Sequence, residues 1–406
     1  MKQDSRDMIH PETICAHFAE DPQAYHGAVI PPIFQNSLFT FPNFEARASN
    51  YQLAPEEVEQ AAGGLSHSYD YTRISNPTTD IVERKIAALE GGEAARCFGS
   101  GMGAISASIL SCVKAGDHVV APFTTYGPTR SFLEKYLNKF NISATYVNGT
   151  DPTDYENALR SNTTLLYLES PSSVVMYQQD IEAIAAIARA CGASTICDNS
   201  WASPIFQNPL SFGVDIVVHS ATKYLGGHSD IVAGVAVGGR ERMKKLIMEE
   251  GFLLGATLDP FASWLLLRGL RTLPIRMERH QQNARIIAER LQQHDKVSHV
   301  CYPGLSWDTQ SSLTMKQLRG TSGLLSIRLS KPGRESAAIF VNHLKYFSIG
   351  VSWGGFESLA LPIPVPADWI GGDRGCAAWF VRLHIGLENP EDLWSDIEGA
   401  LAAIPE

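Results

Sequence analysis

A short apolar run that ends in two hydroxyl groups and a lysine constrains the fold of this chain more than any other stretch. Ile216–Val218 predicts a buried strand, and the backbone can turn freely soon afterwards at Gly226–Gly227. Between them lie Lys223 and, alternating before it, Ser220 and Thr222, whose hydroxyls could both face a phosphate. Burial lowers the pKa of a lysine and frees its amine as a nucleophile. The segment therefore predicts a Schiff-base lysine, and the ordinary alternative is a surface lysine after a core strand.

A second short strand ends in a carboxylate. Ser194–Cys197 predicts this strand, and Asp198 follows it, leaving room for one chain connection before Lys223. An aspartate beside the pyridinium nitrogen and a lysine on the aldehyde carbon are the two protein groups that pyridoxal phosphate requires. The pair predicts pyridoxal 5'-phosphate as the cofactor. The alternative is that Asp198 only caps the next helix.

These segments also carry a resemblance to a known family. Ser220–Asp230, with the sequence SATKYLGGHSD, and Asp198–Pro204, with the sequence DNSWASP, resemble the Cys/Met-metabolism family of pyridoxal-phosphate enzymes. That family includes cystathionine β-lyases, cystathionine γ-lyases and γ-synthases, and methionine γ-lyases. The resemblance extends from about Val29 to the C-terminus. It implies an α/β protein of the fold-type I transferase-like class, with a large, mostly parallel sheet domain and a smaller C-terminal α/β domain.

The order of apolar runs agrees with this architecture. Strand-like and helix-like segments alternate through the middle of the chain, as in a helix-covered parallel sheet. A Rossmann dehydrogenase would alternate similarly, but no G-x-G-x-x-G follows the first strand. We predict an N-terminal arm over residues 1–65, a large cofactor-binding domain over 66–265 and a small domain over 266–406. Such a long irregular opening is unusual in a compact domain, and the resemblance implies that it wraps a neighbouring subunit.

Composition narrows the functional classes. The net charge of −10 argues against nucleic acid and anionic membranes as partners. Seven cysteines without a CxxC pair argue against a disulfide framework and against a metal site. No signal-peptide pattern opens the chain, and no apolar run approaches membrane-spanning length. We expect a cytoplasmic protein that acts on small molecules.

The resemblance assigns further residues to the cofactor. Gly101 and Met102 match the family's phosphate-binding positions at the start of a helix, where backbone amides bind anions. Tyr126 matches the tyrosine that stacks on the cofactor ring and assists proton movement. Tyr71 and Arg73 match residues that reach the cofactor phosphate of the adjacent subunit. The resemblance therefore implies dimers with shared active sites, and a homotetramer of two such dimers.

Two other segments match the substrate-facing part of the family's site. The element that begins at Glu169 carries Ser173 where most members have the asparagine that bonds the cofactor's phenolic oxygen. A compact turn near the C-terminus contains Val351, Ser352 and Trp353, which we expect at the substrate. Arg382 matches the arginine that binds the substrate α-carboxylate, for which a guanidinium fork is suited.

Together these features predict a pyridoxal-phosphate-dependent carbon–heteroatom lyase that releases a 2-oxo acid and ammonia from an amino acid. Ser352–Gly354 and Ser173 resemble cystathionine β-lyases. Val351 instead matches methionine γ-lyases, and the proline-rich run Leu361–Pro366 departs from the usual pattern. A γ-elimination or γ-replacement enzyme for methionine, an activated homoserine or canavanine is therefore the alternative. A homologue that binds the cofactor without catalysis is a third hypothesis, disfavoured because the expected site residues are present.

The distal end of the substrate is the open question. A valine at position 351 cannot pair with a cationic tail, such as that of cystathionine. The arm carries Glu56, Glu57 and Glu59, which are the available candidates for that role.

Overall fold

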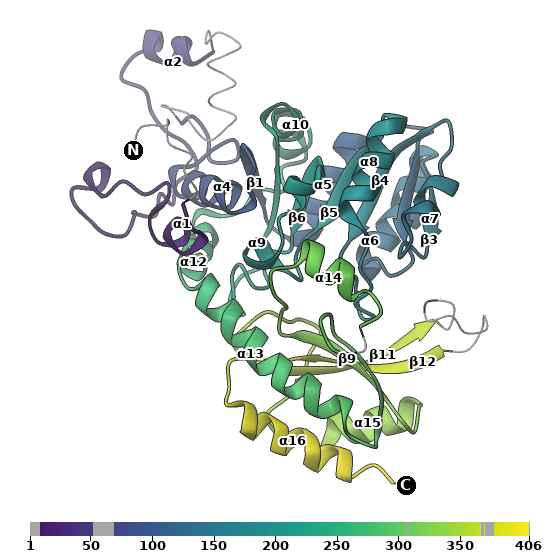
Figure 1. Ribbon diagram of the computed structural model, residues 1–406. Coiled ribbons are helices and arrows are strands. Elements are labelled where there is room, and N and C mark those ends of the chain that lie inside the picture. Colours follow the sequence, from purple (N-terminus) through teal and green to yellow (C-terminus); the bar gives the residue numbers. More distant parts are fainter. Residues whose placement is uncertain (1–8, 52–68, 307, 367–368, 370–376, 406) are drawn as a thin grey trace.

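The chain folds into two lobes, each built around its own sheet (Figure 1). The computed structural model describes residues 9–51, 69–306, 308–366, 369 and 377–405. The α/β class predicted from the sequence is confirmed. The described residues contain no helix that is long and apolar enough to cross a membrane, and no group of three or more His, Cys, Asp or Glu side chains that could hold a metal ion.

The larger sheet has seven strands in the order β1-β7-β6-β5-β4-β2-β3, and only β7 runs antiparallel to its neighbours. Its central strands are buried along their length because helices cover both faces of such a sheet. The predicted parallel sheet is therefore confirmed. The strands are β1 (Ala94–Phe98), β2 (His118–Pro122), β3 (Ser143–Val147), β4 (Thr163–Glu169), β5 (Ser194–Asp198), β6 (Ile216–His219) and β7 (Gly234–Gly238).

The helices of this lobe begin and end at residues suited to those positions. Helix α4 starts after Asn76, whose side chain accepts from the Thr78 amide, and it ends at Gly91 in the left-handed region with φ 74°. The helices are α1 (Pro11–His17), α2 (Phe44–Tyr51), α4 (Pro77–Glu90), α5 (Gly101–Cys112), α6 (Gly127–Ser131), α7 (Pro152–Asn157), α8 (Ile181–Cys191), α9 (Ser203–Phe206), α10 (Arg240–Leu246), α11 (Phe252–Leu254) and α12 (Pro260–Leu270). Short 3₁₀ or π-helical turns occupy η1 (Pro22–Tyr25), η3 (Phe132–Tyr136), η4 (Leu137–Phe140), η5 (Pro209–Phe212) and η6 (Ile247–Gly251).

The smaller sheet has five strands in the order β10-β11-β12-β9-β8 and is mostly antiparallel. The proline-rich run forms strand β11. Prolines are tolerated in this strand because β10 pairs only with Leu359 and Ala360. Beyond these two residues, one side of β11 is an edge of the sheet among the described residues, and a proline there removes no hydrogen bond between strands. The elements are α13 (Leu273–Gln292), β8 (Val297–Cys301), α14 (Ser311–Gln317), β9 (Leu324–Leu329), α15 (Arg334–His343), β10 (Ser348–Ile349), β11 (Leu359–Pro366), β12 (Ala377–His384) and α16 (Pro390–Ala402).

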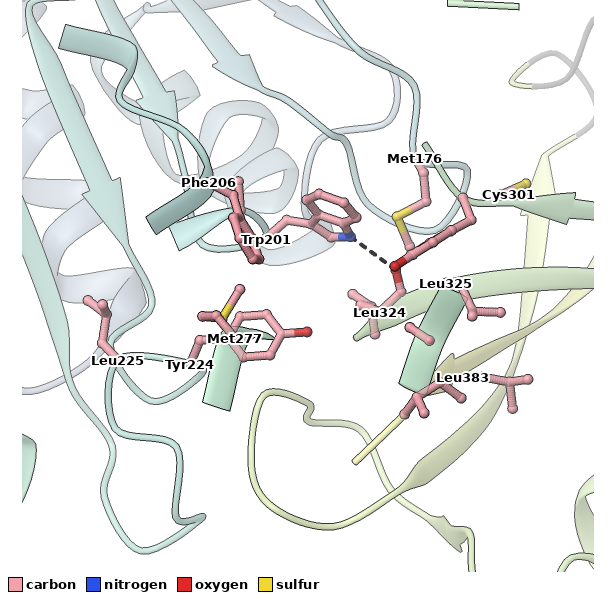
Figure 2. Packing of buried hydrophobic residues seen from close by; sticks show 14 of the residues in the cluster. Met176, Trp201, Phe206, Tyr224, Leu225, Met277, Cys301, Leu324, Leu325 and Leu383 are labelled. Carbon is pink, nitrogen blue, oxygen red and sulfur yellow. Dashed lines mark hydrogen bonds between the residues drawn. The ribbon is translucent and has the colours of Figure 1, made fainter. Parts of the chain in front are cut away.

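One hydrophobic core joins the two lobes. Buried side chains from both sheets and from α13 belong to the same cluster, and Figure 2 shows Met277 and Tyr224 near Leu324 and Leu383. The Trp201 indole N–H donates to the Leu324 carbonyl at 3.1 Å across this junction. The lobes therefore pack against each other through apolar side chains. The exact division at residue 265 stays a prediction.

A buried ion pair ties the N-terminal segment to the large lobe. Lys85 Nζ donates to Glu20 Oε1 at 2.6 Å and to the Cys15 carbonyl at 2.8 Å, and its side chain is fully buried. Arg271 bonds the second oxygen of Glu20 at 2.7 Å. Helix α1 is thus fixed, whereas Val29 after it is 82% exposed. Glu56, Glu57 and Glu59 lie outside the described residues.

Candidate active site

A cavity of about 270 Å³ lies where the carboxyl ends of β4, β5 and β6 face the small lobe. Ligands bind at the carboxyl ends of the strands in open α/β sheets, so this position is the expected one. Most of the residues predicted for the site line it, namely Gly101, Met102, Tyr126, Asp198, Ser220, Thr222, Lys223, Val351, Trp353 and Arg382. Ser352 joins them through a bond to Lys223.

The Lys223 amine is held by the turn from the small lobe. Its Nζ donates to Ser352 Oγ at 2.6 Å and lies 5.4 Å from the centre of the Trp353 ring. Burial, and after it the positive charge of Arg382, lower the pKa of Lys223 to about 8, although the charge of Asp198 opposes the shift. About a tenth of this amine is therefore uncharged at pH 7, far more than for an ordinary lysine, and that form can act as a nucleophile or a base.

Two carboxylates lie side by side at the ends of β4 and β5. Glu169 and Asp198 are register partners in the sheet, and both are buried. Burial and the charge of Asp198 raise the pKa of Glu169 to about 8. Burial also raises the pKa of Asp198, while its bonds to Ser200 and the nearby His219 and Lys223 charges oppose that rise. The hydrogen bonds from Ser200 and the charges of His219 and Lys223 favour the ionised form of Asp198, which is the form that suits a pyridinium nitrogen.

Glu169 also organises its surroundings. Its Oε2 accepts from the Tyr126 backbone N–H at 2.7 Å, and its Oε1 accepts from Ser173 Oγ at 2.7 Å. The serine that replaces the family's usual asparagine thus lines the cavity while bonded to a buried carboxyl group. Glu169 was not among the predicted site residues, although a carboxylate at the end of a parallel strand was the available signal.

The start of α5 forms an anion-binding cradle against the lysine segment. A Cβ on Gly101 would lie 2.9 Å from both Cβ and Oγ of Ser220, so only glycine allows this close approach. The Ser100 side chain caps the Gly103 amide, which leaves the earlier amides directed at the cavity. Thr222 lines the cavity too, but its hydroxyl is bonded to the Ala233 backbone at 3.0 and 3.1 Å. The start of α5 and Ser220 therefore fit a phosphate group.

Arg382 stands at the other end of the cavity. Its Nη2 donates to the carbonyls of Val351 and Ser352 at 2.7 and 3.2 Å. Burial lowers the pKa of this arginine to about 10, which leaves it charged at neutral pH. A charged guanidinium in a confined site is suited to a carboxylate.

Tyr71 and Arg73 do not join the cavity. They line a second, more open depression with residues such as Gln35 and Thr257. The Arg73 side chain donates to the Phe252 carbonyl at 2.8 Å and stacks on the Phe252 ring at 4.5 Å. Their predicted role across a subunit boundary stays a prediction.

Several lining residues had no signal in the sequence. Val174, Val232 and Leu324 add apolar side chains to the cavity wall, and none of them was a predicted site residue, although Val174 directly follows Ser173 in the matching Glu169 element. Leu324 enters the site from the small lobe at the beginning of β9. The packing of the small lobe on the large one brings Leu324 to the cavity, whereas Val174 and Val232 come from loops of the large lobe.

The low pKa of Lys223 makes a direct prediction for the cofactor-free protein. An amine-arylating reagent reacts only with uncharged amines, so the labelling of Lys223 should reach half its maximum near pH 8. Exposed lysines should continue to gain reactivity up to about pH 10.4. Peptide mass spectrometry across a pH series measures both in one sample. An Arg382→Leu variant should move the Lys223 midpoint upward, and a midpoint for Lys223 equal to that of the exposed lysines would contradict the assignment.

The chain is similar to known proteins along nearly its whole length. It is 39% identical over 387 residues to an L-methionine gamma-lyase of Treponema denticola, covering 93% of each chain. It is 37% identical to an L-alanine/L-glutamate racemase of Wolbachia pipientis wMel, covering 94% of each. It is 36% identical to a putative cystathionine beta-lyase of Rhizobium johnstonii, covering 96% of each.

The fold and the family agree with these relatives. The crystal structure of metB from Corynebacterium glutamicum superposes with a TM-score of 0.86 at 34% identity, covering 97% of this chain and 98% of that one. The family described as Cys/Met metabolism PLP-dependent enzyme matches residues 12–402. The resemblance seen in the lysine and aspartate segments is confirmed. The chain therefore belongs to the Cys/Met metabolism family of pyridoxal-phosphate-dependent enzymes, and its cofactor is pyridoxal 5'-phosphate.

Proposed function

We propose that the protein is a lyase that breaks the carbon–sulfur bond of a sulfur-containing amino acid. The observation that carries this proposal is the amine of Lys223, held by Ser352 in a cavity that also contains Asp198 and Arg382. These are a base, a partner for the cofactor nitrogen and a binding group for a carboxylate. Two relatives support the same class of reaction, because one is named as a methionine gamma-lyase and the other as a putative cystathionine beta-lyase.

Each residue has a task in this reaction. Pyridoxal phosphate, when bound, acts as an electron sink for the substrate α-carbon. Asp198 keeps the pyridine nitrogen protonated, while the start of α5 and Ser220 bind the phosphate. Arg382 binds the substrate α-carboxylate. Lys223 Nζ removes the α-proton and returns a proton later, and the hydroxyl of Tyr126 assists that transfer.

β-Elimination of cystathionine is the first candidate. Ser352–Gly354 and Ser173 support it through their resemblance to cystathionine β-lyases. The second candidate is γ-elimination from an uncharged thioether such as methionine. The apolar lining by Val174, Val232 and Val351 supports it. Of the ionisable lining residues, Asp198, Lys223 and Arg382 are assigned to the cofactor or the α-carboxylate, and Glu169 is bonded to the Tyr126 N–H and to Ser173.

A product assay on an amino-acid panel separates these candidates. Pyruvate reports β-elimination, whereas 2-oxobutyrate from methionine reports γ-elimination. A racemised amino acid without ammonia would contradict the lyase assignment and favour the activity named for the Wolbachia relative. A protein that binds cofactor but turns over nothing would favour a regulatory role.

Val351 is the position at which substrate charge can be tested. A carboxylate there can form a charge-assisted hydrogen bond with the distal ammonium of cystathionine, worth roughly 1.5 kcal/mol or about tenfold. We therefore expect Val351→Glu to raise the ratio of kcat/KM for cystathionine over methionine by about tenfold. Val351→Gln is the matched control, with nearly the same shape and no charge. An equal change for both substrates would show that residue 351 does not meet the distal group.

An assembly with shared sites belongs to the same proposal. Tyr71 is 43% exposed and lies outside its own cavity with Arg73, as expected if both serve a neighbouring subunit. Val29 and Leu38 of the arm are 82% and 54% exposed, and a second copy of the chain would cover them. We propose a homotetramer of two such dimers, and a cytoplasmic location, which the free state of the described cysteines supports.

A further inference from the structure

One wall of the cavity is a continuous segment of the large lobe. Pro171–Val174 line the cavity without a break, which is the longest such stretch in its described lining. The segment lies in the loop between β4 and α8, where the Ser172 N–H donates to the Tyr177 carbonyl at 2.8 Å. This bond closes the loop on itself, and loops held in this way are common carriers of binding residues.

Val174 has a strained backbone conformation within this loop. Its φ is 65°, and the Val175 N–H donates to the Ser173 carbonyl at 2.8 Å. A hydrogen bond between residues two apart, around a central residue of positive φ, makes a γ-turn of the rare and strained kind. A β-branched residue is an outlier in this region because its Cβ crowds the backbone. Strain of this kind persists only where the surroundings enforce it, and it concentrates at functional sites.

The large lobe fixes the beginning of the loop. Ser173 Oγ donates to Glu169 Oε1 at 2.7 Å, and the Glu169 N–H donates to Gln179 Oε1 at 3.0 Å. The Gln179 N–H donates to Ser170 Oγ at 3.1 Å. Met176 is buried, and Figure 2 shows it among the apolar side chains at the junction between the lobes. The residues on both sides of the strained turn are therefore tied to the large lobe or to the core.

Two glutamines of the small lobe fix the end of the loop. Gln310 Nε2 donates to the Gln178 carbonyl at 2.7 Å, and Gln310 Oε1 accepts from the Gln178 N–H at 2.9 Å. Gln317 Nε2, from α14, donates to the Gln179 carbonyl at 3.0 Å and to Ser170 Oγ at 3.2 Å. Gln317 is buried, and buried polar groups are costly to leave without partners. The small lobe therefore supplies part of the restraint that keeps the strained turn in place.

The assignment of the other groups leaves this wall to the side chain of a bound amino acid. Asp198 and the start of α5 are assigned to the cofactor, and Arg382 to the substrate α-carboxylate. Lys223, the proposed base, then determines where the α-carbon lies. The lining that remains for the substrate side chain includes the apolar side chain of Val174. The volume of a residue in this wall limits the room for that side chain, because protein interiors are close-packed.

We propose that Val174 is a specificity-determining residue that sets how long a substrate side chain the cavity accepts, and that Gln310 and Gln317 are positioning residues that hold its strained turn in the cavity wall. This inference deepens the proposed function and rests on it for the link to turnover. A wall held from both lobes cannot withdraw from a longer side chain without losing these hydrogen bonds, so the limit is built into the fold.

Binding of straight-chain L-amino acids to the full-length holoenzyme tests the length limit. The absorbance of the cofactor reports the binding of each member, from alanine through 2-aminobutyrate, norvaline and norleucine to 2-aminoheptanoate. Each buried methylene should tighten binding about fourfold until the chain meets Val174, and no further. We expect Val174→Ala to extend this limit by at least one methylene and Val174→Leu to shorten it by one. Wild-type affinity that keeps rising through the series, or an unchanged limit in whichever of the two variants folds, would overturn the proposal.

Substitutions of the two glutamines test the positioning role. Gln310→Ala and Gln317→Ala should relax the limit, so that norleucine gains affinity about fourfold while alanine, which is too short to meet the wall, changes less than about twofold. Lys316→Ala is the matched control, because Lys316 of α14 pairs with Asp180 and Glu182 beyond the loop and should leave the series unchanged. A structural role alone would lower the melting temperature and leave the ratio of norleucine affinity to alanine affinity at the wild-type value, which would overturn the positioning role.

Melting temperatures of the holoenzyme test the strain without any substrate. At ordinary backbone angles alanine stabilises a fold more than glycine does, whereas at a positive φ glycine is favoured. Val174→Gly should therefore melt about 1–2 °C above Val174→Ala, and Val175→Gly below Val175→Ala, because Val175 lies outside the left-handed region. The reverse order at residue 174 would overturn the strained turn. A holoenzyme that binds the amino-acid series but releases no 2-oxo acid would contradict the proposed function alone.

Discussion

Lys223→Ala is expected to abolish turnover while leaving a folded protein. Lys223 is the base nearest to the substrate in the proposed reaction. A positioned general base raises the reaction rate about 10²–10⁴-fold, so we expect kcat to fall by about 10⁴-fold. Removal of the side chain leaves the core intact, because the amine faces a cavity and bonds only Ser352 among the described contacts. Cofactor should still bind through the phosphate cradle and Asp198, but more weakly and reversibly.

Borohydride reduction of the holoenzyme followed by peptide mapping identifies the lysine that carries the cofactor. The label should lie on Lys223 in the wild type and be absent from the variant. Lys85 is the informative internal control, since it is more deeply buried than Lys223 but donates to Glu20 and to the Cys15 carbonyl. Label on Lys85 or any other lysine would show that the central assignment is wrong.

Mixing inactive Arg73→Ala and Lys223→Ala proteins is expected to restore activity. If Arg73 serves the cavity of the neighbouring subunit, a hybrid dimer contains one site with both defects and one intact site. Random exchange at equal amounts makes half of the dimers hybrids, so about a quarter of the wild-type activity should return. The exposure of Tyr71 and the separation of Arg73 from its own cavity motivate this expectation.

Subunit exchange must be shown independently, for example by native mass spectrometry of differently tagged chains. Arg285→Ala is the matched control for loss of a surface arginine, because Arg285 only pairs with Glu289 four residues away and should retain full activity. If hybrids form and no activity returns, Arg73 and Lys223 serve the same chain, and the shared-site arrangement is wrong.

The sequence alone determined the class of fold and the central chemistry. A short apolar strand followed by hydroxyls, a lysine and glycines is a local pattern, and so is the strand that ends in Asp198. Such patterns can be recognised in the sequence, because the burial of a short strand and the backbone freedom of a glycine each depend on only a few neighbouring residues. The structure brings Lys223, Asp198, Gly101 and Arg382 to one cavity, as the segments and the family resemblance implied. Their roles in catalysis remain predictions.

Only the tertiary structure decided the remaining features, because each depends on register or on the packing of the two lobes. Glu169 meets Asp198 through the alignment of β4 with β5, which no spacing along the chain encodes. Ser352 reaches Lys223 from 129 residues away because the small lobe packs on the large one. His280 of α13 and His384 of β12, whose ring centres are 5.1 Å apart, meet only because distant segments pack together. Such contacts form only when many side chains that are distant in the sequence pack into one core, so they cannot be predicted from short sequence patterns.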